Sequence, residues 1–337
     1  MGFSVKEGRM QVGWAEEAAQ HLLFTPSPRR FPKYHKNNIF GHIISDMDRC
    51  FQPSEMNTVE TYPFHPLNAF SQSYNLPMPQ TIPTAEPFFF PGKGNSARIG
   101  CLVTHGFTGA PKEVRWLGEY LNRQGYTVCG MRLAGHATRP ADMVRSRWQD
   151  WLLSVEDGYN LLHSCTDQVF LLGLSMGGVL SLTAASIFPV RGVVAMSTPY
   201  TLPAIPLPLW LVRLISNFKP YLPKGKVPGS GWFDQAAFQQ HVSYPMNPLR
   251  SGIELKFLID EMHAALPKIS VPVLLIHSHD DDYVIKDSME QIYGHLSTSD
   301  KQMMWVAGGG HVITEEPTRE VVFKAAADFV QWVSKSS

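Results

Sequence analysis

The chain has 337 residues, of which 29 are basic and 29 acidic, so its formal net charge at pH 7 is zero. This neutral balance gives no support for nucleic-acid binding, which needs a basic face. Hydrophobic residues make up 44% of the chain and charged residues 17%, a composition that supports a large core and excludes disorder throughout. No apolar run approaches the roughly 18 residues of a membrane span, and the length allows one large globular domain or two ordinary ones.

The first 84 residues carry no sustained hydrophobic pattern and are predicted to form an N-terminal extension. Only 14–23 has weakly helical spacing of its apolar residues. The extension is either an extra segment packed on or trailing from a domain, or sequence upstream of a true start at Met78. The second interpretation is favoured because regular patterning begins only after Met78. The 260 residues from Met78 onward suit a single α/β domain, which is predicted over 85–337.

Strand and helix signals alternate from residue 98 onward. Short apolar runs predict buried strands at 99–105, 126–131, 168–172, 192–196, 271–277 and 301–306. Helical spacing predicts helices over 111–123, 142–163, 177–187 and 317–333. This alternation predicts the α/β class, with a mostly parallel central sheet and helices on both faces.

Residues from about 200 to 270 interrupt the alternation. The stretch 202–215 reads LPAIPLPLWLVRLI, which is too apolar for a solvated loop and too broken by proline for a membrane span. We expect a helical cap inserted above the sheet, covering a site. The alternative is an extra helical hairpin without a role in substrate binding.

The segment GLSMGG at 173–178 lies between a predicted strand and a predicted helix. It matches the G-x-S-x-G pattern of a nucleophile elbow in the strand–turn–helix context that this motif requires. Glycines let the tight turn approach neighbouring backbone, and the turn lifts the hydroxyl of Ser175 clear of the sheet. Ser175 is therefore the candidate nucleophile, and a glycine-rich turn without a catalytic role is the alternative.

A serine nucleophile needs a base, and the base needs an orienting acid, in the chain order Ser, Asp or Glu, His. His311 follows the last predicted strand on a glycine-rich loop, so it is the candidate general base; a surface-loop histidine is the alternative. The acid is expected after the strand at 271–277, where Asp280, Asp281 and Asp282 are consecutive. The same cluster with His277 and His279 could be a metal site, but adjacent residues on one turn do not converge easily on one ion.

Acyl transfer also needs hydrogen-bond donors for the developing oxyanion. One expected donor is the backbone N–H after the nucleophile, that of Met176, and the other comes from the loop after the first patterned strand. In that loop, HGFTG at 105–109, Phe107 is the expected donor. His105 is predicted to hold the loop and not to act as a second base.

Taken together, these motifs resemble the α/β-hydrolase superfamily and, more narrowly, the small carboxylesterases and monoacylglycerol lipases of bacilli. The matching segments are AEPFF at 85–89, HGFTG at 105–109, GYTVC at 125–129, RL at 132–133, GH at 135–136, DW at 150–151, GLSMGG at 173–178 and GHV at 310–312. They extend over roughly residues 80–335. The sequence departs from the family at Ala137, where a Gly-His-Gly loop has its second glycine, and the cap and residues 1–77 have no matching counterpart.

The resemblance implies the α/β-hydrolase fold, oxyanion donors at Phe107 and Met176, and a choice among the three aspartates. The family's acid lies three residues after a small residue that ends the strand, here Ser278, and two or three before an aliphatic one, here Val284. This spacing selects Asp281, with Asp280 and Asp282 as fallbacks.

The expected function is two-step hydrolysis of carboxylic esters through an acyl-enzyme on Ser175, without a metal or cofactor. The apolar cap favours a fatty-acyl or other small hydrophobic ester as substrate, such as a monoacylglycerol, and a transient contact of the cap with a lipid surface. A thioesterase or an acyltransferase could use the same three residues, and a non-catalytic ligand-binding protein of the same fold is the remaining alternative.

The location of the protein is expected to be cytoplasmic. Its four cysteines, at 50, 101, 129 and 165, are too few and too scattered for a disulfide framework or a zinc site, so a reducing compartment is expected. The first thirty residues lack the basic and then apolar pattern of a secretory signal.

Overall fold

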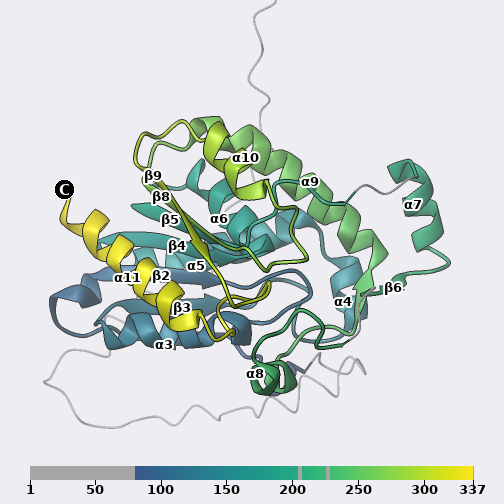
Figure 1. The fold of residues 1–337 in the computed structure, drawn as a ribbon, viewed down its shortest axis with the longest axis horizontal. Helices are drawn as coiled ribbons and strands as arrows, with labels where there is room; N and C mark the ends of the chain where they lie inside the picture. The colour runs from purple at the N-terminus through teal and green to yellow at the C-terminus, as the bar shows by residue number, and fades with distance from the viewer. Residues whose placement is uncertain (1–79, 204–206, 225–227, 337) are drawn as a thin grey trace, which may run out of the picture. The chain divides into compact units, whose positions relative to one another are not determined.

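The computed structural model describes residues 80–203, 207–224 and 228–336 (Figure 1). Most of the predicted N-terminal extension, with the weak helix at 14–23 and the alternative start at Met78, lies outside these residues. From residue 80 on the extension contacts the domain. The N–H of Ile82 donates to the carbonyl of Ala137 at 2.8 Å, and Ile82 packs against the hydrophobic core, so contact with the domain begins before the predicted boundary at 85.

A seven-stranded sheet, in the order β1-β3-β2-β4-β5-β8-β9, forms the centre of the described residues. Only its edge strand β1 pairs antiparallel with its neighbour, and the other pairs are parallel. The strands are β1 (Phe88–Phe90), β2 (Ile99–Thr104), β3 (Thr127–Met131), β4 (Gln168–Leu174), β5 (Gly192–Met196), β8 (Val273–Ser278) and β9 (Lys301–Val306). The predicted mostly parallel α/β architecture is confirmed, and β1 is a strand that the sequence pattern did not indicate.

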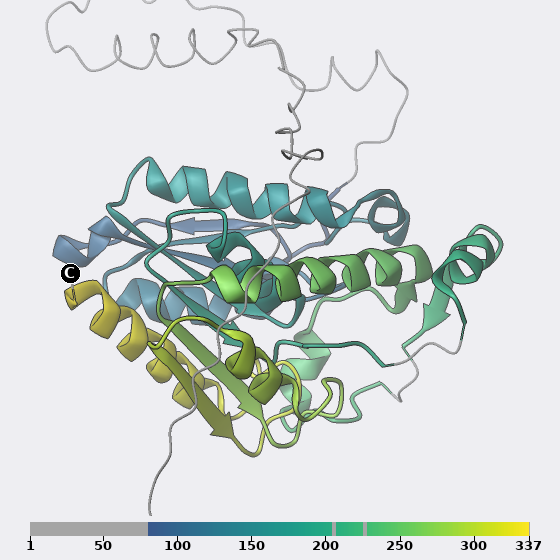
Figure 2. The ribbon, with the colours of Figure 1, turned by 90° about the horizontal axis from the view of Figure 1, so that it is seen from above.

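Helices cover both faces of the sheet (Figure 2). On one face lie α5 (Trp148–His163), α6 (Met176–Ala185), α9 (Leu249–Ala265) and α10 (Ser288–His295). On the other lie α3 (Arg115–Arg123), preceded by the 3-10 turn η2 (Pro111–Val114), and α11 (Arg319–Lys335). Successive residues of a strand face opposite sides. The inner strands β2, β4, β5 and β8 are buried on both sides, which explains why they are largely apolar runs.

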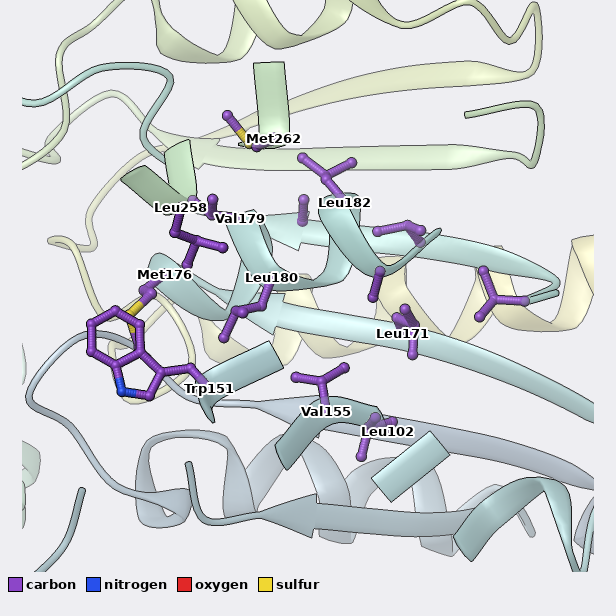
Figure 3. Packing of buried hydrophobic residues seen from close by; sticks show 14 of the residues in the cluster. Leu102, Trp151, Val155, Leu171, Met176, Val179, Leu180, Leu182, Leu258 and Met262 are labelled. Carbon is purple, nitrogen blue, oxygen red and sulfur yellow. The ribbon is translucent and has the colours of Figure 1, made fainter. Parts of the chain in front are cut away.

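The core of the first face is shown in Figure 3. It consists of buried side chains from the strands and from the helices on this face, among them Leu102, Trp151, Leu171, Val179 and Leu258. Residues Met176 to Ala184 of α6 are all buried. The helix that follows the predicted nucleophile therefore packs on every side.

The long helix predicted over 142–163 is wrong in one respect, because it is two helices, α4 (Pro140–Arg145) and α5. Ser146 between them is extended, with φ −73° and ψ 156°. The N–H of Arg147 donates to the carboxylate of Asp150 at 2.8 Å, and the indole of Trp151 donates to the hydroxyl of Ser146 at 2.9 Å. These bonds start a new helix at Trp148, which apolar spacing alone does not indicate.

The insertion expected over about 200–270 consists of two different parts. The part up to residue 248 holds α7 (Leu209–Ser216), α8 (Gln235–Gln240) and a small ribbon of β6 (Tyr221–Pro223) with β7 (Met246–Pro248). The last part is α9, whose Leu258, Ile259 and Met262 are buried in the core against α6. The residues before α9 thus differ from α9 in their packing, and the cap stays a prediction; in both views α7 lies at the outer end of α9 (Figures 1 and 2).

The remaining short elements of the described chain are the 3-10 turns η1 (Gly94–Arg98) and η3 (Leu266–Lys268). None of the helices described here combines the length and the apolarity needed to cross a bilayer.

Candidate active site

Ser175 lies in the turn between β4 and α6, where the sequence predicts a nucleophile elbow. Its backbone has φ 55° and ψ −119°, a conformation that costs a residue with a Cβ on the order of 1–3 kcal/mol. The N–H of Ser175 donates to the carbonyl of Met196 on β5 at 2.7 Å, which fixes the turn to the neighbouring strand. The strain is therefore held in place by the sheet.

The glycines of the elbow are required by close backbone contact. A Cβ on Gly173 would collide with the carbonyl of Gly177, and a Cβ on Gly177 would collide with the carbonyl of Thr104 on β2. The two glycines are therefore needed because β4, α6 and β2 approach one another too closely for a side chain.

The structure brings Ser175, His311 and Asp281 into one hydrogen-bonded chain. His311 Nε2 lies 3.0 Å from Ser175 Oγ, and His311 Nδ1 lies 2.8 Å from Asp281 Oδ2. The other carboxylate oxygen of Asp281 accepts the N–H groups of Tyr283 at 2.8 Å and Val284 at 3.1 Å. These bonds orient the carboxylate, and the carboxylate orients the imidazole with Nδ1–H toward it and Nε2 toward the serine.

The pKa shifts of Asp281 and His311 are those expected for an imidazole base that is hydrogen-bonded to a carboxylate. Burial alone would raise the pKa of Asp281, but the charge and hydrogen bond of His311 and the two backbone donors lower it overall. Burial alone would lower the pKa of His311, but the charge and hydrogen bond of Asp281 and the nearby Glu113 raise it overall. Each partner favours the charged form of the other.

The two fallback aspartates lie elsewhere. Asp280 is exposed and accepts the N–H of Gly308 at 2.6 Å, so it supports the loop that carries His311. Asp282 is exposed and lies beside Gly231 of the insertion. Of the three, Asp281 is the one bonded to the imidazole.

The imidazoles of His277 and His279 contact protein groups on or beside the strands nearby. His277 Nε2 accepts the N–H of Thr198 at 3.0 Å, and burial lowers the pKa of His277 to about 4. The ring of His279 stacks on Trp305 with centroids 4.4 Å apart. The ring of His277 also meets Trp305 edge-on, with centroids 6.0 Å apart, so both rings contact this side chain of β9.

The two expected oxyanion donors belong to two segments that lie next to Ser175. Met176 is the first residue of α6, where the backbone N–H has no partner within the helix. Phe107 follows Gly106, at which an added Cβ would lie 3.3 Å from the Cβ of Ser175. His105 holds this loop as predicted: its Nδ1 lies 2.9 Å from the carbonyl of Gly106, and its Nε2 accepts the N–H of Leu133 at 3.2 Å.

Buried acidic residues near the loops were not predicted from the sequence. Glu113 accepts the N–H of Gly106 at 2.8 Å and lies 3.6 Å from the ring of His241, which in turn lies 2.7 Å from Glu315. Burial raises the pKa of Glu113. A glutamate at the start of an amphipathic helix has the pattern of a solvated residue, so the only available signal was its position close after the HGFTG loop.

The insertion contacts both loops around Ser175. The N–H of Tyr244 donates to the carbonyl of Thr108 beside Phe107 at 2.9 Å. The N–H groups of Phe233 and Asp234 donate to Glu316, five residues after His311, each at 3.0 Å. The stretch 231–244 thus lies against the loop that carries Phe107 and against the loop that carries His311.

Comparison with known proteins places the chain in a family and gives it relatives of known name. The family model of the serine aminopeptidases S33 (Hydrolase_4) matches residues 95–318. A carboxylesterase of Bacillus subtilis (strain 168) is 32% identical over 252 residues, covering 74% of this chain and 98% of its own. A thermostable monoacylglycerol lipase of Bacillus sp. (strain H-257) is 31% identical over 254 residues, covering 73% and 94%.

Solved structures show the same fold. One from work on LipS and LipT, two metagenome-derived lipolytic enzymes, superposes with a TM-score of 0.67 at 30% identity over 75% of this chain and all of that one. The monoacylglycerol lipase of Paleococcus ferrophilus superposes with a TM-score of 0.62 at 21% identity over 74% of this chain and 99% of that one. The predicted resemblance is confirmed, and the chain belongs to the serine aminopeptidase S33 family of α/β-hydrolases.

Proposed function

We propose that the protein is a carboxylic ester hydrolase that cleaves fatty-acyl esters such as monoacylglycerols through an acyl-enzyme on Ser175. The observation that carries the proposal is the hydrogen-bonded chain from Ser175 through His311 to Asp281, at 3.0 and 2.8 Å. The carboxylesterase and the monoacylglycerol lipase among its relatives support esters as the substrate class.

In the first step, Ser175 Oγ attacks the ester carbonyl while His311 Nε2 takes its proton. Asp281 stabilises the imidazolium that forms, and the N–H groups of Phe107 and Met176 are proposed to bind the oxyanion. His311 then gives the proton to the departing alcohol, which leaves the acyl group on Ser175. In the second step, a water activated by His311 releases the acid.

The acyl specificity follows from the residues that cover the site. Residues before α9 are proposed as the cap, because the stretch 231–244 lies against both catalytic loops. We expect Ser175-dependent turnover to peak at medium or long acyl chains, because apolar burial contributes about 0.8 kcal/mol per methylene.

The test is the hydrolysis rate across esters from acetyl to palmitoyl, monoacylglycerols and an acyl thioester, with Ser175→Ala as the blank. Turnover confined to acetyl and butyryl esters would contradict the fatty-acyl part of the proposal. Preference for the thioester, or acyl transfer to an added alcohol in place of water, would favour a thioesterase or an acyltransferase. No Ser175-dependent turnover of any substrate would overturn the hydrolase proposal.

We further propose that α7 and the turn after it touch a lipid surface transiently. Trp210, Leu214 and Phe218 are spaced four residues apart and are 68%, 50% and 84% exposed. Large exposed apolar side chains gathered on one short segment mark an interaction site more often than scattered ones do. The cationic Arg213 and Lys219 beside them are also exposed.

Replacing these three residues by serine is expected to lower cosedimentation with phosphatidylglycerol vesicles several-fold. Activity on a short soluble ester is expected to change less than about twofold, because the three side chains are exposed. The matched control replaces Leu153 and Leu161, two exposed leucines of α5, by serine. Equal loss of vesicle binding in both variants would contradict a specific role of α7.

The proposed cytoplasmic location has its support in the described cysteines. Cys101 and Cys129 are buried on the adjacent strands β2 and β3, Cys165 is exposed, and all three are free thiols. Free thiols are the usual state in a reducing compartment.

A further inference from the structure

Glu316 is a fully buried carboxylate that joins two parts of the chain. One oxygen, Oε1, accepts the N–H of Gly310 at 3.1 Å, and Gly310 immediately precedes His311. The other, Oε2, accepts the N–H groups of Phe233 and Asp234 at 3.0 Å each, in the stretch of the insertion that leads into α8. A single side chain thus bridges the loop of the base and the proposed cap.

The two bridged segments also touch directly. A Cβ on Gly310 would collide with the carbonyl of Gly231, so the backbone of the insertion lies on the backbone of the histidine loop. The loop is held from its other side by the acid's strand and the turn after it. Ser278 donates to the carbonyl of Gly309, and Asp280 accepts the N–H of Gly308. Gly308 and Gly309 are thus bonded to Asp280 and Ser278, whereas the N–H of Gly310 is bonded to Glu316.

Burial disfavours the charged form of Glu316, and the hydrogen bonds that its carboxylate accepts offset this effect only in part. Burial raises the pKa of Glu316, and the N–H groups of Asp234, Gly310 and Phe233 lower it. A carboxylate accepts at both oxygens, whereas the side chain of glutamine has one accepting oxygen and one donating nitrogen. Only the carboxylate can accept hydrogen bonds from both segments at the same time.

We propose that Glu316 is a positioning residue that makes the placement of His311 depend on the cap stretch 231–234. When that stretch is seated, its two N–H groups fix the carboxylate, and the carboxylate fixes the amide next to His311. If the stretch moves away, Glu316 keeps one of its three donors, and the loop loses a support at residue 310. This proposal rests on the proposed function. It adds that the position of His311 depends on whether residues 231–234 are bound to Glu316.

The neighbouring Glu315 provides a matched control. It is also buried, and its carboxylate also binds the insertion, at His241 just after α8. Its partner is a side chain of the insertion, whereas Glu316 bonds the amide of Gly310 as well. Glu315→Gln therefore weakens an attachment of the insertion without removing the bridge to the histidine loop.

The readout is the ratio of kcat/KM for an alkyl ester to kcat/KM for the p-nitrophenyl ester of the same acid. An alkoxide must be protonated by His311 as it leaves, whereas p-nitrophenolate leaves without a proton. Misplacement of His311 therefore lowers the alkyl rate more than the aryl rate. A variant that is only partly folded loses both rates by the same factor, so its ratio stays unchanged.

We expect Glu316→Gln to lower the ratio about tenfold, in line with the sensitivity of catalysis to small misplacements, and Glu315→Gln to leave the ratio within about twofold of wild type. Glu316→Asp, which keeps two accepting oxygens on a shorter chain, is expected to restore part of the loss. An unchanged ratio in Glu316→Gln, or an equal fall in both glutamine variants, would overturn the proposal.

If Glu316→Gln yields no folded protein, the same ratio is compared between Glu316→Asp and Glu315→Asp. A fall of two- to threefold in the first variant alone supports the bridge, and equal ratios overturn it. Failure of the proposed function has a different result: the wild type would then hydrolyse neither ester in a Ser175-dependent way.

Discussion

Ser175→Ala is expected to lower kcat for ester hydrolysis by about 10⁵- to 10⁶-fold, the loss typical of removing a serine nucleophile. The hydroxyl is the atom that forms the acyl-enzyme, and no other hydroxyl is hydrogen-bonded to His311 among the contacts of the described chain. The measurement is turnover of a medium-chain ester by purified protein, together with labelling by a fluorophosphonate probe. Labelling of the alanine variant at the wild-type rate would show that another residue is the nucleophile.

The same position gives a stability test of the elbow strain. Ser175→Ala keeps a Cβ at φ 55° and is expected to unfold with nearly the wild-type free energy. Ser175→Gly removes the Cβ, and relief of about 1–3 kcal/mol of strain exceeds the roughly 0.5–1 kcal/mol entropic cost of glycine. The glycine variant is therefore expected to be more stable than the alanine variant by about 1 kcal/mol in urea unfolding. A less stable glycine variant would show that the turn carries no strain.

Asp281→Asn is expected to lower kcat by about 10⁴-fold, because an amide at this position favours the wrong tautomer of the base. Asp281 is the carboxylate bonded to His311 Nδ1, at 2.8 Å. Asp280→Asn serves as the matched control, since Asp280 bonds the N–H of Gly308 and asparagine keeps an accepting oxygen. It is expected to cost less than about tenfold. The reverse order of effects would move the acid to Asp280.

The pH profile of the residual activity gives a second test of Asp281. Its charge and hydrogen bond raise the pKa of His311 against the effect of burial. The base must be neutral to act, so kcat/KM falls as pH falls through the pKa of His311 in the free enzyme. Loss of the carboxylate charge lowers that pKa, and the acidic limb of the profile is expected to shift to lower pH in Asp281→Asn. An unshifted limb would mean that the limb reports another group.

The parts of the fold that are apolar runs could be predicted from the sequence with nearly correct ends. The strands at 192–196 and 301–306 have the bounds expected for them. The first is buried at every position and is therefore an unbroken apolar run, whereas the second is a partly exposed edge strand whose apolar residues follow Lys301 and Gln302. β1 was missed since it is a three-residue edge strand, Phe88–Phe90, without alternation. The break at Ser146 was missed since it depends on hydrogen bonds from Arg147 and Trp151 and not on periodicity.

The residues of the candidate site also differ in whether the sequence predicts them. Ser175 and His311 lie on motifs whose spacing follows from the chemistry, and the choice of Asp281 among three aspartates came from resemblance to a family. Glu113 and Glu316 could not be predicted, because their partners are backbone N–H groups, which leave no mark in the side-chain sequence. The sequence pattern includes α9 in the predicted cap, whereas the structure packs this helix on α6, a segment about 75 residues earlier. A contact between segments so far apart in the chain leaves no local signal in the sequence.

The complete burial of α6 sets the order in which the site loses its structure. Amide protons of a helix enclosed on every side exchange with solvent only when the whole cooperative unit opens, and Met176 to Ala184 are enclosed in this way. The loops that carry Phe107 and His311 lie outside the helices and strands, and such segments open at lower free energy. In mild denaturant the nucleophile therefore stays fixed while the groups that act on it loosen, so activity is lost before the sheet unfolds.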